Sequence, residues 1–301
     1  VSIGTTKQKF SAQSARRIGQ ENLKPSFPQD KNMLVNNKKF TIGADPEVFV
    51  ADSLTNTFVS AHDLVPGTKL EPFAVNKGAV QVDGMALEFN IDPADSFEEF
   101  EDNLNSVQNT LAGMIGDKKF IQDASVYFDE EFVKGVPEFN LMLGCEPDYN
   151  GWTMDVNAPA DAASLMRTAG GHVHVGGFFT DDPFSPEHFA TCARLARTMD
   201  HTLGVYSVLW DKDDKRRSMY GKAGSFRPKP YGMEYRTLSN RWIFNTDLIR
   251  FVYNATQEAL EKMFDPSFSV GEEVREIINS SDRSSEFFLT PNACKKVELL
   301  V

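Results

Sequence analysis

The chain has 301 residues, of which 41% are hydrophobic and 25% are charged, and it contains 24 Phe. This composition excludes a wholly disordered chain, and the length allows one large domain or two small ones. The net charge of −12 argues against nucleic acid as a partner, because an acidic protein repels a polyanion.

Cysteine usage and hydropathy exclude two further classes of protein. Cys145, Cys192 and Cys294 are widely spaced and form no CxxC pair, so neither a disulfide framework nor a cysteine zinc site is indicated. No run approaches the roughly 20 apolar residues of a membrane helix, and the first residues lack a signal-peptide pattern. We therefore expect a soluble protein of the cytoplasm that has no membrane partner.

The first 39 residues differ in charge from the rest. Through Phe40 the sequence has eight basic residues and two acidic ones, and it is rich in Gln, Asn and Ser. Its few apolar residues show no regular period, so we expect residues 1–39 to form a basic arm that is partly disordered or loosely packed. The arm is either a solvated leader or a segment that docks on an acidic partner or a neighbouring subunit. Residues 40–301 are expected to form a single domain.

Strand-like runs follow the arm. They are FTIGADPEVFVA, TFVS and AVQVDGMALEFNI, and glycines and prolines separate them as turns. A helix is predicted over about 96–115, because Ser96 and Glu99 have the form of a capping box and apolar residues follow at spacings of three and four.

Two more helices are predicted in the second half of the chain. One starts at Ser185 with Pro186 in its first turn, and its apolar period continues to Leu203. The other spans about 246–263. Strands and helices do not alternate one for one, so an α+β fold with an antiparallel sheet is favoured over a doubly wound parallel sheet.

Four segments combine an apolar face with a polar face, because residues i and i+2 of a strand share a side. The segments are GADPEVFV, DGMALEFNI, GHVHVG and MEYRTL. Their polar faces carry Asp45 with Glu47, Glu88 with Ala86 and Asn90, His172 with His174, and Glu234 with Arg236. In the second segment the predicted apolar face consists of Met85, Leu87, Phe89 and Ile91.

A polar face with this many carboxylates would repel itself unless cations occupied it. Carboxylates with one or two imidazoles suit Mg²⁺ or Mn²⁺. Two alternatives stay open: catalytic zinc on the two histidines, and histidines that only satisfy backbone hydrogen bonds. Each polar face taken alone is also compatible with simple exposure to water.

The segment YGKAGSFRPKPYGMEYR supplies the opposite charge. Lys222, Arg227, Lys229 and Arg236 occur within 15 positions, and such groups can clamp phosphoryl oxygens. A solvated basic loop is the alternative interpretation. Neither GxxxxGK[ST] nor GxGxxG is present, so metals and basic side chains would have to hold any phosphates.

Several motifs together closely resemble the phage-type carboxylate-amine ligases (COOH-NH2 ligase, type 2), of the glutamine synthetase and glutamate-cysteine ligase superfamily. The resemblance covers about residues 40–260 through GADPEVF, SAHDLVPGTK, VQVDGMALEFNIDP, LGCEPDYNGW, RTAGGHVHVG and YGKAGSFRPKPYGMEYRTLSNRW. It implies a glutamine-synthetase-like domain over 40–301 with a curved antiparallel sheet backed by helices. It also implies an ATP-dependent ligase with two or three Mg²⁺ or Mn²⁺ ions that joins a carboxylate donor to an amine acceptor through an acyl phosphate. The location would be the host cytoplasm if the gene belongs to a phage.

The resemblance also implies roles for individual residues. The expected metal ligands are Asp45, Glu47, Glu88, His172, His174 and Glu234. ATP is expected to meet His172, His174, Lys222, Arg227 and Arg236, and catalysis is assigned to Arg236, Lys222, Arg227 and Glu88. Asp83 and Glu146 are candidates for holding the amine. Asp45 stands where glutamate-cysteine ligases usually carry Glu, which weakens its assignment as a direct ligand.

Two other functions compete with the ligase. A zinc or manganese hydrolase would use His172, His174 and the carboxylates to activate water without a nucleotide. A non-enzymatic binding protein would dock through the basic arm. The sequence leaves open the two substrates, the general base, the oligomeric state, the role of the arm and whether the isolated chain is active.

Overall fold

The computed structural model describes residues 34–35, 38–141, 147–158 and 165–300. In this part of the chain ten strands form one sheet, in the order β10-β13-β14-β12-β3-β7-β6-β5, with β4 and β8 both paired to β3. Every pairing between its strands is antiparallel, as the sequence predicts. The strands are β3 (Thr41–Asp52), β4 (Phe58–Val59), β5 (Phe73–Val75), β6 (Gly78–Asp83), β7 (Ala86–Ile91), β8 (Lys118–Ile121), β10 (Tyr149–Asn150), β12 (Gly171–Gly176), β13 (Ser225–Lys229) and β14 (Gly232–Tyr235).

Two small strand pairs lie outside this sheet. They are β1 (Leu34–Val35) with β2 (Lys38–Lys39), and β9 (Ser125–Tyr127) with β11 (Met166–Thr168). Most of the predicted basic arm lies outside the described residues, so the division at residue 39 stays a prediction. In the described part of the chain, no helix is both long enough and apolar enough to span a lipid bilayer.

The three predicted helices are confirmed, with one difference. The first is α1 (Phe97–Met114), where Ser96 accepts a hydrogen bond from the backbone N–H of Glu99, and the third is α7 (Thr246–Met263). The second begins as predicted with α4 (Pro186–Met199), but a π-helical turn, η1 (Asp200–Gly204), separates it from α5 (Val205–Trp210). A π turn adds one residue to the helical repeat, which a search for a 3.6-residue period does not detect.

Short helices complete the fold. They are α2 (Glu130–Lys134), α3 (Glu138–Leu141), α6 (Asp214–Met219), η2 (Asn240–Phe244), α8 (Glu272–Ser280), η3 (Glu286–Leu289) and α9 (Pro291–Val297).

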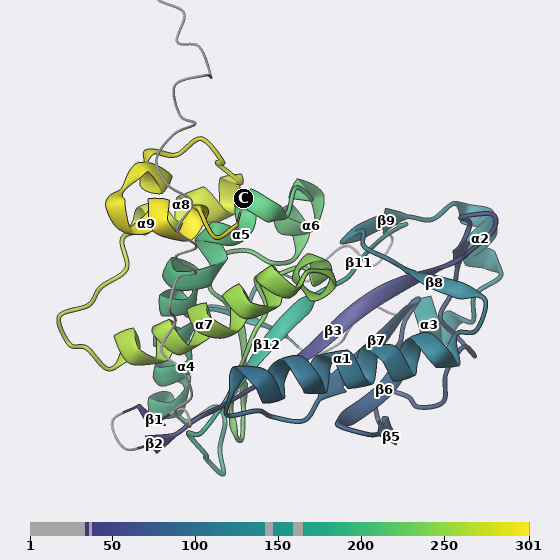
Figure 1. Cartoon of the computed structure of the whole chain (residues 1–301), viewed down its shortest axis with the longest axis horizontal. Helices are drawn as coiled ribbons and strands as arrows, with labels where there is room; N and C mark the ends of the chain where they lie inside the picture. Colours follow the sequence, from purple (N-terminus) through teal and green to yellow (C-terminus); the bar gives the residue numbers. More distant parts are fainter. Residues whose placement is uncertain (1–33, 36–37, 142–146, 159–164, 301) are drawn as a thin grey trace, which may run out of the picture. The chain divides into compact units, whose positions relative to one another are not determined.

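One face of the sheet carries the main hydrophobic core. Val48, Leu87, Phe89 and Val173 are fully buried on this face. Helix α1 packs on β6 and β7, α4 packs on β13 and β14, and α7 contacts both helices. Figure 1 shows α1 lying across β6, β7 and β3. An antiparallel sheet covered in this way leaves its other face for polar side chains.

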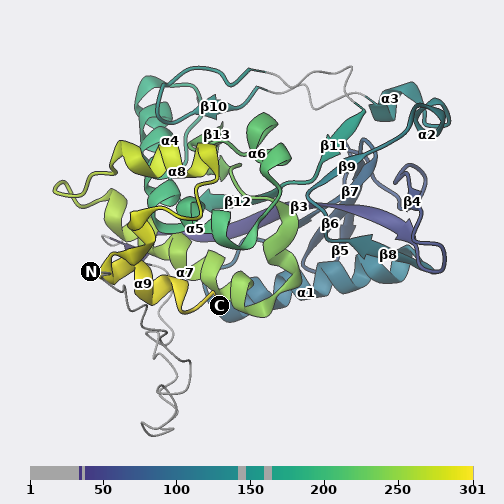
Figure 2. The same ribbon diagram turned by 90° about the horizontal axis from the view of Figure 1, so that it is seen from above.

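The other face borders a smaller apolar cluster. In Figure 2, β9, β11 and α6 lie on the side of β3 opposite α1. Phe49 and Met85 pack there with Val126 and Phe128. The prediction that Met85 shares the face of Leu87 is wrong, because Met85 lies in the turn before β7, where strand alternation does not yet apply.

Candidate functional site

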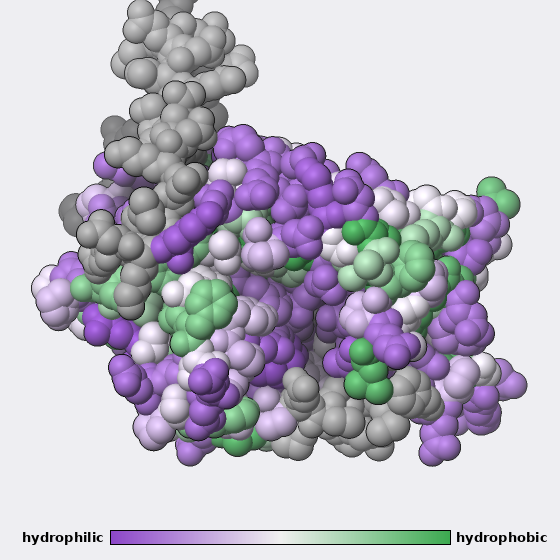
Figure 3. All heavy atoms as spheres, turned by 90° about the horizontal axis from the view of Figure 1, so that it is seen from below, coloured by the Kyte–Doolittle hydropathy of each residue, from purple (hydrophilic) through white to green (hydrophobic). Residues whose placement is uncertain are grey.

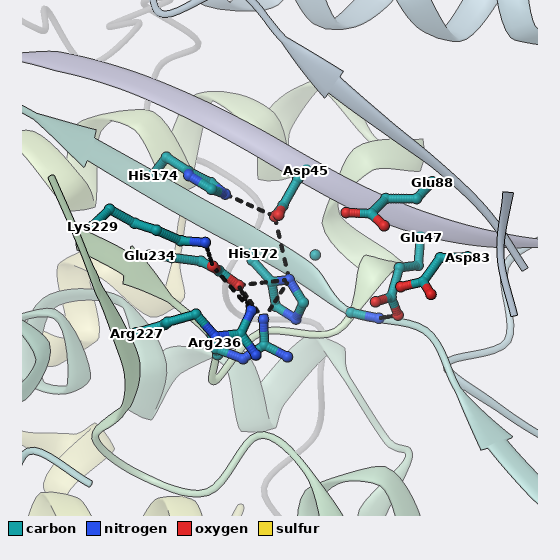
Figure 4. Close-up of polar contacts among 12 residues, drawn as sticks. Asp45, Glu47, Asp83, Glu88, His172, His174, Arg227, Lys229, Glu234 and Arg236 are labelled. Atoms are coloured by element: carbon teal, nitrogen blue, oxygen red, sulfur yellow. Dashed lines mark hydrogen bonds and ion pairs between the residues drawn. The ribbon is translucent and has the colours of Figure 1, made fainter. Parts of the chain in front are cut away.

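Strand register brings the polar residues of four distant segments onto one face of the sheet. On β12, His172 lies opposite Asp45 of β3, and His174 lies opposite Glu234 of β14. Glu47 of β3 lies opposite Glu88 of β7. Directly opposed residues of an antiparallel pair have neighbouring side chains on the same face. The structure therefore places the residues that the sequence singles out along one continuous wall (Figure 4).

The glycine before β12 makes room for this wall. A Cβ on Gly170 would overlap the ring of His172, so a larger residue would displace the imidazole. The backbone N–H of Gly170 also donates a hydrogen bond to Glu47 Oε2, at 2.7 Å. Gly170 thus positions a histidine and a carboxylate at once, which gives a physical reason for the first of the two glycines before the histidines.

Asp45, His174 and Glu234 could together hold a metal ion. One ligand atom of each lies within 4.8 Å of the other two. Asp45 Oδ1 is 3.0 Å from His174 Nε2 and 3.2 Å from His172 Nδ1. Both Asp45 Oδ1 and His174 Nε2 are nevertheless buried without a well-formed hydrogen bond, so their close approach is electrostatic. Buried ligand atoms without a well-formed hydrogen bond, drawn from carboxylates and an imidazole, fit a divalent cation such as Mn²⁺ or Mg²⁺.

The surroundings of Asp45 and His174 support this interpretation. Tyr231 hydroxyl contacts His174 Nδ1 and so fixes the ring with Nε2 toward Asp45, the role of an outer partner in many metal sites. Burial alone would raise the pKa of Asp45, but His174 and His172 outweigh it and lower the pKa below the ordinary range. Burial would likewise lower the pKa of His174, and the charge of Asp45 raises it instead.

Three cations surround Glu234, which is 1% exposed. Arg236 forms an ion pair with its Oε1, Lys229 Nζ lies 3.0 Å from Oε2, and Arg227 Nη1 lies 3.4 Å from Oε2. Burial disfavours the charged form of Glu234, yet Arg236 and the two histidines hold its pKa well below the usual range. The three cations and the metal-capable group therefore meet at one carboxylate (Figure 4). We call Arg227, Lys229 and Arg236 the basic cluster.

A second group of carboxylates lies further along the wall. Asp83 and Glu88 lie beside Glu47 in Figure 4. Glu88 Oε2 accepts a hydrogen bond of 2.8 Å from Gln81, and Lys69 Nζ lies 3.1 Å from Asp83 Oδ2. Burial, together with the charges of Asp45 and Asp83, raises the pKa of Glu88 well above its ordinary value. We call Glu47, Asp83 and Glu88 the acidic cluster, and its mutual repulsion makes it a place for a cation.

A cavity of about 800 Å³ lies against this wall. Asp45, His172, Glu234, the basic cluster and the acidic cluster line it, whereas His174 contacts the site through Asp45 without lining the cavity. Lys222 lines it too, although its side chain is exposed. Figure 3 shows a hollow on the lower face of the molecule with hydrophilic residues around it. Glu146 lies outside the described residues.

Sequence patterns missed several residues that line the cavity: Lys69, Asp148, Arg167, Arg216 and Tyr220. They come from loops, from the short strand β11 and from α6, where alternation along a long strand gives no signal. Asp148 stands in the motif LGCEPDYNGW, two residues after Glu146, which the sequence analysis chose as an amine contact, so the motif itself was informative.

A second cavity, also of about 800 Å³, is separate from these residues. Asp123, Trp210, Asp213, Lys215 and Arg241 are among the residues that line it. None of the predicted site residues lies in its wall. The carboxylates that could bind a metal ion and the cations that could bind phosphate therefore lie around the first cavity.

Comparison with known proteins connects this geometry to one family. Residues 162–265 match the family model described as "Phage phiEco32-like COOH.NH2 ligase-type 2", which confirms the predicted resemblance. The matched part contains β12, β13 and β14 with both histidines and the basic cluster. No curated protein matches the chain. A match of this kind supports an enzyme that forms carbon–nitrogen bonds, with small-molecule or peptide substrates in general.

Proposed function

We propose that this chain, with its carboxylate-amine ligase segment, is an ATP-dependent ligase that uses Mg²⁺ or Mn²⁺ and forms an amide through an acyl phosphate. One observation carries the proposal: Glu234 joins the metal-capable group of Asp45 and His174 to the basic cluster in one cavity wall. When no glycine-rich loop is present, divalent ions and basic side chains have to neutralise and hold the phosphates of a nucleoside triphosphate.

The ligand distances among the described residues fit a divalent ion at one place, and the acidic cluster suggests a second. Asp45, His174 and Glu234 would hold one ion, with His172 beside them. Glu47 and Glu88 of the acidic cluster would contribute to a second, because the strand register sets the two carboxylates opposite each other. When bound, such ions neutralise phosphate oxygens and polarise the transferred phosphoryl group.

The basic cluster would bind the phosphoryl group that moves. An oxygen of the donor carboxylate attacks the γ-phosphorus, and the bond from that phosphorus to the bridging oxygen of ADP breaks. Arg227, Lys229 and Arg236 face the charge that develops there, and guanidinium groups suit such oxyanions. Arg236 stays cationic, because the charge of Glu234 outweighs burial and raises its pKa.

Asp83, at one side of the acidic cluster, would receive the amine. An amine that binds as an ammonium group must first lose a proton to a base. After phosphoryl transfer its neutral nitrogen attacks the acyl carbon, phosphate leaves with the bonding electrons, and the nitrogen loses a second proton to give the amide. Asp83 lines the cavity beside Glu47, and both attract an ammonium group. The antiparallel sheet with helices on one face is also the arrangement expected of a glutamine-synthetase-like domain, which we propose as its fold.

Calorimetry with Mn²⁺ and a non-hydrolysable ATP analogue tests the proposal. The wild-type protein should bind the analogue only with the metal present, and D45N and R227Q should each weaken binding at least tenfold. The exposed Glu272, far along the chain in α8, provides the control E272Q, which should bind as wild type does. If the purified wild-type protein carries stoichiometric zinc and its titration with nucleotide releases no heat, the metal hydrolase is the better assignment.

A further inference from the structure

Arg216 is a buried cation in the wall of the same cavity. It lies in α6, it is 2% exposed, and it lines the cavity. Its Nη1 donates a hydrogen bond of 3.1 Å to the backbone oxygen of Thr237, while its Nε is buried without a hydrogen-bond partner. Among the described residues, no carboxylate oxygen lies within 4.0 Å of its guanidinium nitrogens.

Such a group is costly for the fold alone. A buried charge with no carboxylate at ion-pair distance opposes folding, and proteins keep such features mainly at functional sites. The chain also shapes the space around it, because Gly221 has a φ of +76° and a Cβ there would overlap Nη1. Burial lowers the pKa of Arg216 to about 10, which leaves it charged at neutral pH. The charges of Asp211 and Glu47 oppose this lowering, whereas those of Arg217 and Arg236 add to it.

The next residue, Arg217, shows what a structural arginine looks like at the same depth. It is also 2% exposed, and its Nε and Nη1 are likewise buried without a hydrogen-bond partner. Its Nη2, however, lies 3.5 Å from Asp211 Oδ2 and donates to Ser207 Oγ at 3.3 Å. Arg217 does not line the cavity. Among the described residues the two neighbours therefore differ in two respects: Arg217 has a carboxylate within 4.0 Å and Arg216 has none, whereas Arg216 lines the cavity and Arg217 does not.

We propose that Arg216 binds an oxyanion of a substrate in this cavity, either a carboxylate of the donor or a phosphoryl oxygen of the nucleotide. The identity of these substrates rests on the proposed function, but the presence of the anion subsite does not. A planar guanidinium with unused N–H groups matches both kinds of oxyanion.

Two methionine variants test the inference without any ligand. R216M removes a buried charge that has no carboxylate partner, so its urea midpoint should equal or exceed that of the wild type. R217M leaves Asp211 without its partner, so its midpoint should fall. An R216M protein as destabilised as R217M would assign Arg216 a structural role and overturn the proposal.

Binding then identifies the oxyanion. Inorganic phosphate, glutarate and the Mn²⁺ complex of the ATP analogue are titrated into wild type, R216M, R216K and R217M. R216M should lose at least tenfold in affinity for one or more of them, R216K should lose less, and R217M should bind as wild type does. Weaker phosphate and nucleotide binding indicates a phosphoryl subsite, and weaker glutarate binding indicates a carboxylate subsite.

The outcomes separate this inference from the proposed function. If the wild type binds phosphate or glutarate through Arg216 but no nucleotide, the ligase proposal fails and the anion subsite stands. If R216M binds all three probes as the wild type does, the anion subsite fails. If the wild type binds none of them, both proposals fail.

Discussion

Replacing Glu234 by Gln removes one buried negative charge that three cations share. Lys229 and Arg227 lie 3.0 and 3.4 Å from its carboxylate, and Arg236 also pairs with it. At an effective dielectric constant near 20, each such pair corresponds to about 5 kcal/mol of gross attraction, most of which desolvation offsets. Removing one partner of a buried pair costs about 3–5 kcal/mol, and we expect E234Q to lose that much unfolding free energy.

Urea unfolding at neutral pH and low salt measures this loss. The control is E272Q, because Glu272 forms a pair of 3.3 Å with Arg275 while its side chain is 70% exposed. An exposed pair contributes at most about 1 kcal/mol. Inorganic phosphate should restore part of the stability of E234Q, since an anion can replace the missing charge among the cations. The reasoning is wrong if E234Q loses no more stability than E272Q.

Two further predictions concern the histidine and the π turn. G170A should weaken Mn²⁺ binding by about tenfold or more, because the new Cβ displaces the His172 ring. G113A is the control in α1: nothing lies within 4 Å of its new Cβ, so its unfolding free energy should rise by up to about 1 kcal/mol. Mn²⁺ titration measures the first effect and urea unfolding the second, and tight Mn²⁺ binding by G170A would contradict the first prediction. Asp200 begins the π turn, and burial outweighs the effect of its hydrogen bonds and raises its pKa to about 6. The protonated Asp200 therefore stabilises the fold fully below about pH 4, and this stabilisation is lost as the pH rises through 6. Between pH 4 and pH 7 the wild type should therefore lose about 3 kcal/mol relative to D200N, and a pH-independent difference between the two proteins would refute this.

Strand alternation predicted much of the candidate site, because the rule is local and the residues occupy regular strands. His172 and His174 share a face wherever β12 pairs, so their common direction needs no tertiary information. The alternation rule does not predict which strands become neighbours in the sheet. The pairing of His174 with Glu234, and of Glu47 with Glu88, depends on sheet order, which the motifs suggested only through the family resemblance.

Residues outside regular strands were beyond such reasoning. Arg216 lies in a six-residue helix, and its burial beside the cavity depends on contacts with Thr237 and Gly221 that no period encodes. Met85 was misplaced because it precedes the strand by one residue. The role of Glu234 as a shared partner of three cations was also unforeseen, since the sequence suggested a metal ligand and a separate phosphate clamp.

Anomalous diffraction from crystals grown with Mn²⁺ and a non-hydrolysable ATP analogue tests the central claim most directly. The account predicts a manganese peak within bonding distance of Asp45, His174 and Glu234, with the terminal phosphate of the analogue against Arg227, Lys229 and Arg236. Manganese bound elsewhere, or a nucleotide in the cavity beside Trp210 and Arg241, would contradict it.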